Sequence, residues 1–321
     1  MRVLVTGATG LVGKALVKEL HRMDIAVSYL TTNRDKLEDG ANYQGFYWNP
    51  KEGQIDTACF EGVGAVINLA GATISKRWSD SYKKTVLESR IDSINTLHKG
   101  MVEFGPDAIQ QLISASAIGR YPYSLTELYE EDEKAVDDSF LGEVVAQWEE
   151  ALDIFKPLNC TVAKIRIGIV LSTDGGALPQ MIAPIKMGMG AAFGSGLQWQ
   201  SWIHIDDLAK LFTFVLTEKL KGVYNAVAPN PVTNKKLTRQ LAKTLRMPLF
   251  LPNIPKFVMS ATLGEMAYLL FASQRVSSKR IEKKGFVFSY PNIDMAVAQL
   301  LKPDAVSPEP NSSATAQKKY A

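Results

Sequence analysis

The feature that most constrains the fold is a glycine-rich turn directly behind the first apolar segment. The run 3–5 (Val-Leu-Val) leads into Gly7, Gly10 and Gly13, and an amphipathic segment follows at 14–23. A buried strand that turns through glycines into a helix leaves backbone N–H groups and the positive end of the helix dipole facing one point. This arrangement suits a pyrophosphate, so the turn predicts a dinucleotide ligand. The alternative is a glycine turn that serves packing alone.

Each glycine has its own expected task in such a turn. Gly7 permits the tight turn, Gly10 lets a phosphate approach the backbone, and Gly13 lets the helix lie close to the sheet. The spacing is G-x-x-G-x-x-G, which differs from the standard G-x-G-x-x-G pattern. We expect the dinucleotide to contact the whole turn, namely Gly7, Thr9, Gly10, Leu11, Val12 and Gly13.

The rest of the chain alternates strand patterns with helical ones. We expect strands at 26–30, 46–50, 63–71, 111–116, 161–171 and 222–227, and helices at 14–23, 86–102, 141–155, 208–216 and 237–245. The segment 63–71 is apolar almost throughout, which is typical of a strand covered on both faces. This alternation predicts an α/β fold built on a doubly wound parallel sheet, the Rossmann fold.

The chain is expected to divide into three parts. They are a nucleotide-binding domain over 1–235, with substrate-side insertions from about residue 173, a small C-terminal domain over 236–301, and a disordered tail over 302–321. The stretch 175–196 is rich in Gly and Met and indicates either mobile loops over a pocket or an irregular connection. An apolar helix around 259–271 is expected in the small domain, which should cap the substrate side.

Composition excludes several classes of function. The formal charge is +3 and 21% of the residues are charged, which gives no basic stripe of the kind that nucleic acid demands. Cys59 and Cys160 lie far apart without a C-x-x-C pair or a His cluster, so no disulfide framework or metal site is expected. No apolar run approaches the roughly 20 residues of a membrane span. We expect a cytoplasmic protein with a small-molecule substrate and no nucleic-acid or membrane partner.

Five motifs, in this order, resemble the extended branch of the short-chain dehydrogenase/reductase superfamily, whose members include nucleotide-sugar epimerases. They are 6–13 (TGATGLVG), 68–71 (NLAG), 114–116 (SAS), 166–171 (RIGIVL) and 202–208 (WIHIDDL). More narrowly, the chain is similar to atypical epimerase-family proteins, on the motifs 88–90 (ESR), 114–119 (SASAIG), 140–141 (FL) and 148–149 (WE). The resemblance implies the fold and a nicotinamide dinucleotide, and it names no substrate.

The resemblance also assigns further cofactor contacts. Leu69, Ala70 and Gly71 should line the path of the adenosine and diphosphate, with Ser114 on the next strand and Glu88 facing the cofactor cleft. Arg166 either contacts the cofactor or forms a structural salt bridge with a carboxylate of the helix that carries Glu143. One of the two is required, because burying an unpaired cation costs several kcal/mol.

The end of the second strand indicates which dinucleotide is bound. NAD enzymes of this class place a carboxylate there for the ribose 2′-hydroxyl, whereas NADP enzymes offer cations to the 2′-phosphate. This chain has Thr31 and Thr32, followed by Arg34, and no carboxylate before Asp35. NADP is therefore the expected cofactor in preference to NAD. The alternative for Arg34 is a solvated loop charge.

The expected catalytic residues are incomplete. The superfamily uses a Ser together with a Tyr-x-x-x-Lys pair, in which an ammonium helps a phenol of pKa about 10 to exchange protons at neutral pH. Ser116 matches the serine that orients the substrate oxygen, but Phe140 and Val144 stand where Tyr and Lys are expected. Tyr121 on the following loop is either a substitute phenol or an aromatic residue that covers the pocket.

Two functions therefore stay open. The first is an NADP-dependent oxidoreductase or epimerase-like protein acting on a small hydroxyl, carbonyl or sugar-nucleotide-like compound. The second is an NADP-binding regulatory or scaffold protein without catalysis, because a fold does not imply a function.

Two further features have alternative interpretations. His204 lies beside the predicted site and has an imidazole suited to proton transfer, but the same segment in related folds starts a helix with Asp206 or Asp207 as N-cap. The helices expected at 86–102 and 141–155 carry apolar faces that can form a homodimer or pack on the sheet alone.

Overall fold

A computed structural model describes residues 1–301, and its core is a nine-stranded sheet in the order β13-β9-β7-β6-β1-β2-β4-β3, with β5 paired to β4. The two antiparallel edge strands are β3 (Asp39–Gly40) and β5 (Gln54–Ile55). The parallel strands are β1 (Arg2–Thr6), β2 (Ala26–Thr31), β4 (Tyr43–Asn49), β6 (Val63–Asn68), β7 (Gln111–Ala117), β9 (Thr161–Ile167) and β13 (Gly222–Ala226).

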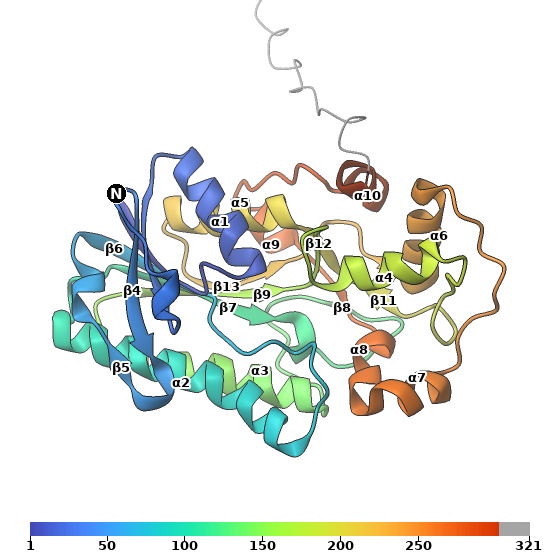
Figure 1. Cartoon of the computed structure of the whole chain (residues 1–321), viewed down its shortest axis with the longest axis horizontal. Coiled ribbons are helices and arrows are strands. Elements are labelled where there is room, and N and C mark those ends of the chain that lie inside the picture. Colours follow the sequence, from blue (N-terminus) through green and yellow to red (C-terminus); the bar gives the residue numbers. More distant parts are fainter. Residues whose placement is uncertain (302–321) are drawn as a thin grey trace, which may run out of the picture.

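Helices cover both faces of this sheet. Figure 1 shows α1 (Leu11–Arg22) and α5 (Ile205–Thr217) on one face, and α2 (Asp80–Phe104) and α3 (Phe140–Ala151) on the other. The strands between them are apolar because both of their sides are buried, as in Val3, Leu4 and Val5 of β1. The predicted doubly wound α/β fold is confirmed.

The order of the strands fixes where a ligand can bind. The chain runs outward from β1 through β2 to β4, then returns to add β6, β7, β9 and β13 on the other side of β1. The order therefore reverses between β1 and β6. In open α/β sheets, ligands bind at the carboxyl ends of the strands at such a point.

A second, smaller hydrophobic core lies beyond the carboxyl ends of the strands. It includes Leu178, Trp202, Leu237, Leu241 and Val297, which belong to segments on both sides of residue 235. The predicted division at 235 stays a prediction, and the expected tail over 302–321 lies outside the described residues. The elements around this core are β10 (Ile169–Leu171), α4 (Ala177–Lys186), β11 (Trp199–Gln200), β12 (Trp202–His204), β14 (Val232–Thr233), α6 (Asn234–Leu245) and α10 (Ile293–Leu301).

The last elements connect this unit to the sheet. Strand β15 (Arg275–Val276) pairs with β8 (Leu128–Tyr129) of the loop behind β7. The helices α7 (Lys256–Leu263), α8 (Tyr268–Phe271) and α9 (Lys279–Glu282) lie in the same C-terminal region.

Three expected elements differ from the structure. The strand expected at 161–171 is two strands that separate at Gly168, where a β-carbon would lie 2.4 Å from the Ser201 carbonyl oxygen. The helix expected at 259–271 is interrupted at Gly264, whose φ of 59° an α-helix does not allow. The stretch 175–196 contains helix α4, which neither interpretation of its composition included.

Candidate cofactor and substrate site

The glycine turn lies at the reversal point between β1 and β6. Gly7 has a φ of 68°, which favours glycine, and its carbonyl oxygen accepts a 3.0 Å hydrogen bond from the Gly10 amide. A β-carbon on Gly13 would lie 2.1 Å from the Gly7 carbonyl oxygen, so only glycine lets α1 pack this closely. At Gly10 a β-carbon would meet only the Gly7 oxygen within 4 Å. The open side of Gly10 leaves space for a ligand to approach the backbone.

The start of α1 has the chemistry that an anion requires. The amides of Leu11, Val12 and Gly13 have no acceptor within the helix, because they belong to its first turn. No acidic residue lies in that turn to occupy them, and Gly10 at the N-cap offers no side chain. The dipole of α1 adds a partial positive charge at the same place. This cradle fits the diphosphate of a dinucleotide, with Thr9 half-buried at its rim.

A buried network of hydrogen bonds fixes the ends of the neighbouring strands. The Thr6 hydroxyl donates to the Asn68 side-chain oxygen at 2.7 Å and accepts 3.0 Å hydrogen bonds from the Leu69 and Ala70 amides. The Asn68 amide group in turn donates to the Ser114 hydroxyl at 3.4 Å. These hydrogen bonds hold the backbone of Leu69 and Ala70 beside the glycine turn, and their contact with a cofactor stays a prediction. Ser114 belongs to this hydrogen-bond network and is fully buried.

The segment that follows contacts α2. Gly71 is exposed and packs against Arg90, whose guanidinium donates to the Ala72 carbonyl oxygen at 3.3 Å. Burial lowers the pKa of Arg90 to about 10. Glu88 does not join this group: its side chain is half exposed and pairs with Lys84 at 3.5 Å.

The predicted 2′-phosphate region lies at the ends of β2 and β4. Thr31 is buried at the end of β2, whereas Thr32 is exposed. The exposed guanidinium of Arg34 stacks on the Tyr47 ring with 3.9 Å between the central guanidinium carbon and the ring centroid. An aromatic face therefore holds this cation at the carboxyl end of the sheet.

Ser116 belongs to a buried charged cluster. Its hydroxyl donates to a Glu149 carboxylate oxygen at 2.7 Å, and Arg166 donates two hydrogen bonds to the same carboxylate at 2.7 and 2.8 Å. Glu149 lies on α3, the helix that carries Glu143, so the salt bridge that was one alternative for Arg166 is present. Arg120 approaches the same carboxylate at 3.9 Å.

The cluster is buried, so its electrostatic interactions are strong. Burial acts to lower the pKa of Arg166 and to raise that of Glu149, but their mutual hydrogen bonds and opposite charges outweigh burial. The net result is a raised pKa for Arg166 and a lowered pKa for Glu149. Glu149 is therefore ionised at neutral pH and accepts a hydrogen bond from the Ser116 hydroxyl, which leaves the lone pairs of the serine oxygen free to accept.

Tyr121 lies deeper than a pocket-lining loop residue. Its ring is fully buried, its hydroxyl accepts from Arg166 at 2.8 Å, and the hydroxyl donates to the Asn225 side-chain oxygen at 2.8 Å. The side-chain amide of Asn225 donates in turn to the Ser277 carbonyl oxygen at 3.0 Å. Burial raises the pKa of Tyr121, and Arg166 offsets this only in part. These contacts correspond to a packing role that ties the C-terminal segment to the sheet.

Phe140 and Val144 take up different environments at the two positions that lack Tyr and Lys. Val144 is buried in the core, whereas Phe140 lines a cavity of about 310 Å³ between α3 and the C-terminal helices. Trp78, Tyr268 and Lys256 line the same cavity. Three of its nine lining residues are aromatic, and the lining includes the phenol of Tyr268 and the ammonium of Lys256, although neither residue stands at the positions of the missing pair.

His204 has a structural role, as one interpretation held, but its neighbours do not cap the helix. The N-cap of α5 is His204 itself, whose Nδ1 accepts from the Asp206 amide at 3.1 Å. Asp207 accepts instead from the Ser289 and Tyr290 amides at 2.9 Å each. The expectation of an Asp206 or Asp207 cap is therefore wrong. Burial lowers the pKa of His204, which keeps the imidazole neutral in this buried position.

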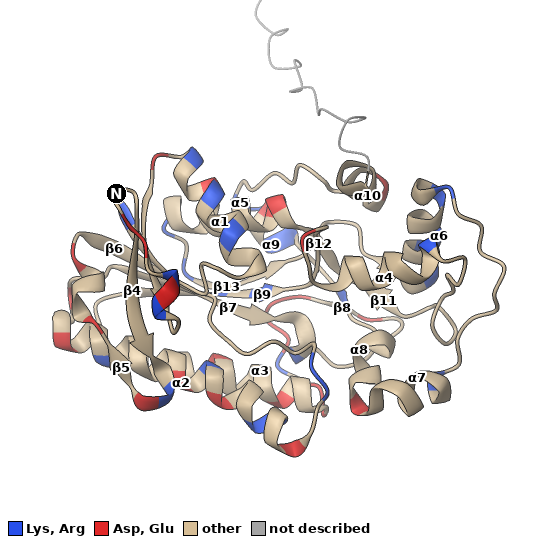
Figure 2. Ribbon diagram, in the orientation of Figure 1, with Lys and Arg blue, Asp and Glu red and all other residues tan. Residues whose placement is uncertain are grey.

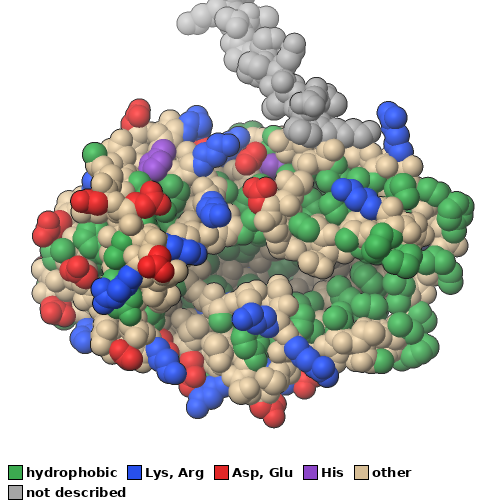
Figure 3. Space-filling model, viewed as in Figure 1, with side chains coloured by type: hydrophobic (Ala, Val, Ile, Leu, Met, Phe, Trp, Pro, Cys, Tyr) green, Lys and Arg blue, Asp and Glu red, His purple; other side chains and the backbone are tan. Residues whose placement is uncertain are grey.

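The site elements border one hollow of the surface. Figure 2 shows charged residues spread over the helices of the molecule. Figure 3 shows the hollow across the middle, between the region of α1 and α4 and that of α3 and α8. Within residues 1–301, no group of three or more His, Cys, Asp or Glu side chains could hold a metal ion.

Sequence reasoning missed several residues that organise the site. Thr6 and Asn68 follow apolar strand residues, and a polar residue at the end of a buried parallel strand is itself a signal of a ligand edge. Glu149 was part of a motif but had no assigned contact. Its link to Ser116 needs the packing of α3 on β7 and β9, which no local pattern encodes.

Comparison with protein families gives two matches. The NAD dependent epimerase/dehydratase family matches residues 3–139 and 169–226, and a domain of unknown function, DUF1731, matches residues 254–300. An epimerase family protein of Staphylococcus epidermidis is 36% identical over 302 residues, which cover 94% of this chain and 99% of the relative. An epimerase family protein of Staphylococcus aureus is 36% identical over 304 residues, covering 93% and 98%.

Solved structures give a matching result. The human epimerase family protein SDR39U1 (isoform 2) with NADPH has a TM-score of 0.81 and 30% identity, covering 94% of this chain and 99% of the human one. A nucleoside-diphosphate sugar epimerase from Corynebacterium glutamicum has a TM-score of 0.74 and 31% identity, covering 94% of this chain and 58% of its own. No helix of the described part of the chain is long and apolar enough to cross a membrane.

Proposed function

We propose that this protein is an NADP-dependent oxidoreductase or epimerase-like protein acting on a small hydroxyl or carbonyl compound. The chain belongs to the NAD dependent epimerase/dehydratase family, which is the premise of this proposal. The observation that carries the proposal is the cradle of Gly7, Gly10 and Gly13 at the reversal point of the sheet. When bound, the nicotinamide supplies or accepts the hydride.

The preference for NADP rests on Arg34. Its guanidinium stacks on Tyr47 at the carboxyl end of the sheet, where a 2′-phosphate would need a cation and where no carboxylate belongs to the strand end. The human relative whose structure contains NADPH supports the same choice. The substitution Arg34→Gln should weaken NADPH binding about 10- to 100-fold, because a charge-assisted hydrogen bond contributes about 1.5–3 kcal/mol.

Titration calorimetry with both cofactors tests this preference. Arg34→Gln should leave NADH affinity unchanged, and Lys36→Gln, on the same exposed turn, should change neither affinity. An equal loss for NADPH and NADH would remove Arg34 from the 2′-phosphate site.

The chemistry of Ser116 supports a substrate with a hydroxyl group. Because its hydroxyl donates a hydrogen bond to Glu149, the serine oxygen can accept a hydrogen bond from a substrate O–H at the end of β7. Glu149 orients the serine and is a weak base, since Arg166 lowers its pKa. Ser116→Ala should abolish turnover of any substrate found, whereas exposed Ser81→Ala should not. Undiminished turnover of the Ser116 variant would refute this role.

A second candidate is a catalytically silent NADP-binding protein. It is favoured by Phe140 and Val144, neither of which can transfer a proton, and by the burial of the Tyr121 hydroxyl. Stable cofactor binding with no hydride transfer to a panel of aldehydes, ketones and sugar nucleotides would support it. Turnover that depends on Ser116 would exclude it.

A further inference from the structure

The segment from α6 to α7 has a one-sided charge. Between residues 234 and 263 the chain has six basic residues and no Asp or Glu. All six are exposed, and none of them forms an ion pair within residues 1–301. They are Lys235, Lys236, Arg239, Lys243, Arg246 and Lys256.

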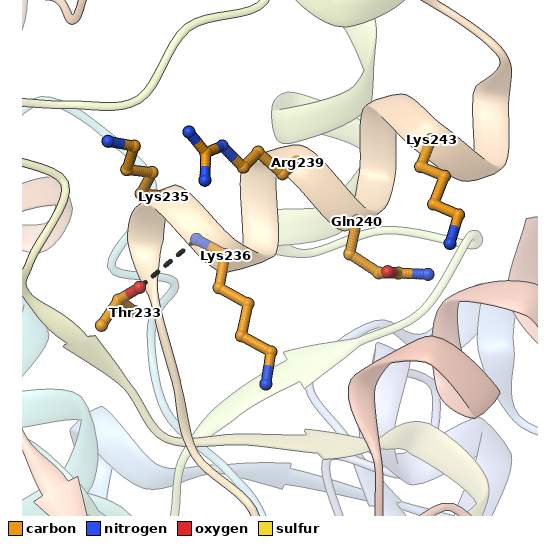
Figure 4. A pocket seen from close by; sticks show the side chains of 6 residues that line it. All are labelled: Thr233, Lys235, Lys236, Arg239, Gln240 and Lys243. Carbon is orange, nitrogen blue, oxygen red and sulfur yellow. Dashed lines mark hydrogen bonds between the residues drawn. The ribbon is translucent and has the colours of Figure 1, made fainter.

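Most of these charges are unfavourable to helix α6 itself, and Lys243 in its last turn is the exception. Lys235, Arg239 and Lys243 follow each other at intervals of four residues, so like charges repel along one stripe. Lys235 and Lys236 also lie in the first turn, where the helix dipole disfavours cations. Figure 4 shows these side chains around a hollow of about 350 Å³ that Thr233 and Gln240 also line. An external anion would relieve this repulsion.

Exposed apolar side chains lie on the segments that follow. Phe250 is 79% exposed and Phe257 is 74% exposed, and Met187 behind α4 is also exposed. Their segments lie side by side, because the Ile254 amide donates to the Ala192 carbonyl oxygen at 2.8 Å. Figure 3 shows hydrophobic side chains gathered over this end of the molecule, to the right in the view. Large apolar residues that cluster on a surface indicate an interaction site.

We propose that this basic and apolar end, which comprises α6, the segment 246–255 and the start of α7, binds the surface of an anionic phospholipid membrane. Phe250, Leu251 and Phe257 enter the interfacial region, while the cations of α6 lie at the lipid phosphates. Interfacial binding depends on this combination of buried apolar area and electrostatic attraction. It needs no membrane-spanning helix, which was the ground for expecting no membrane partner.

The charge distribution favours a membrane over a second copy of the chain. In a two-fold interface the same patch meets itself, so the six cations would be brought together without an opposite charge. An anionic lipid surface carries the charge opposite to that of these cations. The exposed Phe and Leu side chains also suit lipid better than a nucleic-acid backbone.

Vesicle flotation of the full-length protein tests the proposal. Vesicles of phosphatidylcholine mixed with phosphatidylglycerol should bind the protein at least about tenfold more strongly than phosphatidylcholine alone, and added salt should weaken the binding. The double variant Phe250→Ser/Phe257→Ser and the triple variant Lys235→Gln/Lys236→Gln/Arg239→Gln should each reduce binding about tenfold.

Matched controls lie elsewhere on the surface. Val287→Ser, at a position 82% exposed, and Lys283→Gln/Lys284→Gln should leave vesicle binding unchanged. NADPH affinity should stay unchanged in all variants, so this test is independent of the proposed function. Equal binding to both vesicle types, or full binding by the double and triple variants, would overturn the proposal. A dimer in light scattering that Phe250→Ser dissociates would assign the surface to a second copy instead.

Discussion

Replacing Glu149 by Gln tests whether the buried cluster organises the site. The carboxylate accepts two hydrogen bonds from Arg166 and one from Ser116, and it lies 3.9 Å from Arg120. Glu149 is 6% exposed and Arg166 is 3% exposed, so water cannot replace the lost charge. Glutamine keeps the size of the side chain and one acceptor oxygen.

The magnitude follows from the burial of Arg166. Removing one partner of a buried ion pair costs about 3–5 kcal/mol, because the other charge is left uncompensated. Since the amide oxygen of the introduced glutamine can still accept one hydrogen bond, we expect the lower end, about 3 kcal/mol. This is a large part of the total of about 5–15 kcal/mol that a typical protein has. Urea denaturation followed by tryptophan fluorescence measures the loss.

The pH dependence gives a second readout. The folded-state pKa of Glu149 is below its ordinary value of 4.5, because Arg166 outweighs the effect of burial. The ion pair therefore stabilises the fold fully above the unfolded pKa, and this stabilisation is lost as the pH falls through the folded pKa. The difference in unfolding free energy between the wild type and Glu149→Gln should be constant around neutral pH and should shrink below the ordinary pKa of 4.5.

The adjacent residue offers a control for this experiment. Glu150 is exposed on the same helix, and Glu150→Gln should change the free energy of unfolding by no more than about 0.5 kcal/mol. If Glu149→Gln were no less stable than Glu150→Gln at neutral pH, the reasoning about the buried cluster would be refuted.

Three further variants test the rest of the site. Gly13→Ala should reduce NADPH affinity at least about tenfold and destabilise the fold by about 1–3 kcal/mol, because its β-carbon would meet the Gly7 oxygen. Gly64→Ala is the control, because a β-carbon there has open space, and it should change neither quantity. Calorimetry measures the NADPH affinity, and urea denaturation measures the stability. Thr6→Val should cost about 1–3 kcal/mol by leaving two backbone amides without an acceptor, and Thr6→Ser should restore most of it. Tyr121→Phe should cost about 1–3 kcal/mol and leave turnover intact; a selective loss of turnover at native stability would instead indicate a catalytic phenol.

Local chemistry made the start of the fold predictable. The apolar run before the turn, the glycines and the amphipathic helix are all encoded by near neighbours, and the structure confirms β1, α1 and β2 in that order. Elements that depend on distant partners were less accessible. The separation at Gly168 depends on the backbone of Ser201, and α4 is a helix in a stretch whose Gly and Met content suggested loops.

For the site too, the features set by near neighbours were predictable and those set by distant partners were not. The sequence required a polar partner for Arg166, because a cation in a buried strand must be paired, and one of its two alternatives named the correct helix. It did not indicate Glu149, or that Ser116 shares this carboxylate, since both depend on how α3 packs on the sheet. The cap of α5 was missed because His204 uses its ring nitrogen in a position where carboxylates are the more common acceptors.

Calorimetric titration of the wild-type protein with NADPH and with NADH tests the central claim most directly. The cradle of the glycine turn and the stacked Arg34 predict that one NADPH binds per chain and that it binds more tightly than NADH. Tighter binding of NADH would contradict the assignment of the cofactor. No binding of either dinucleotide would contradict the account of the glycine turn itself.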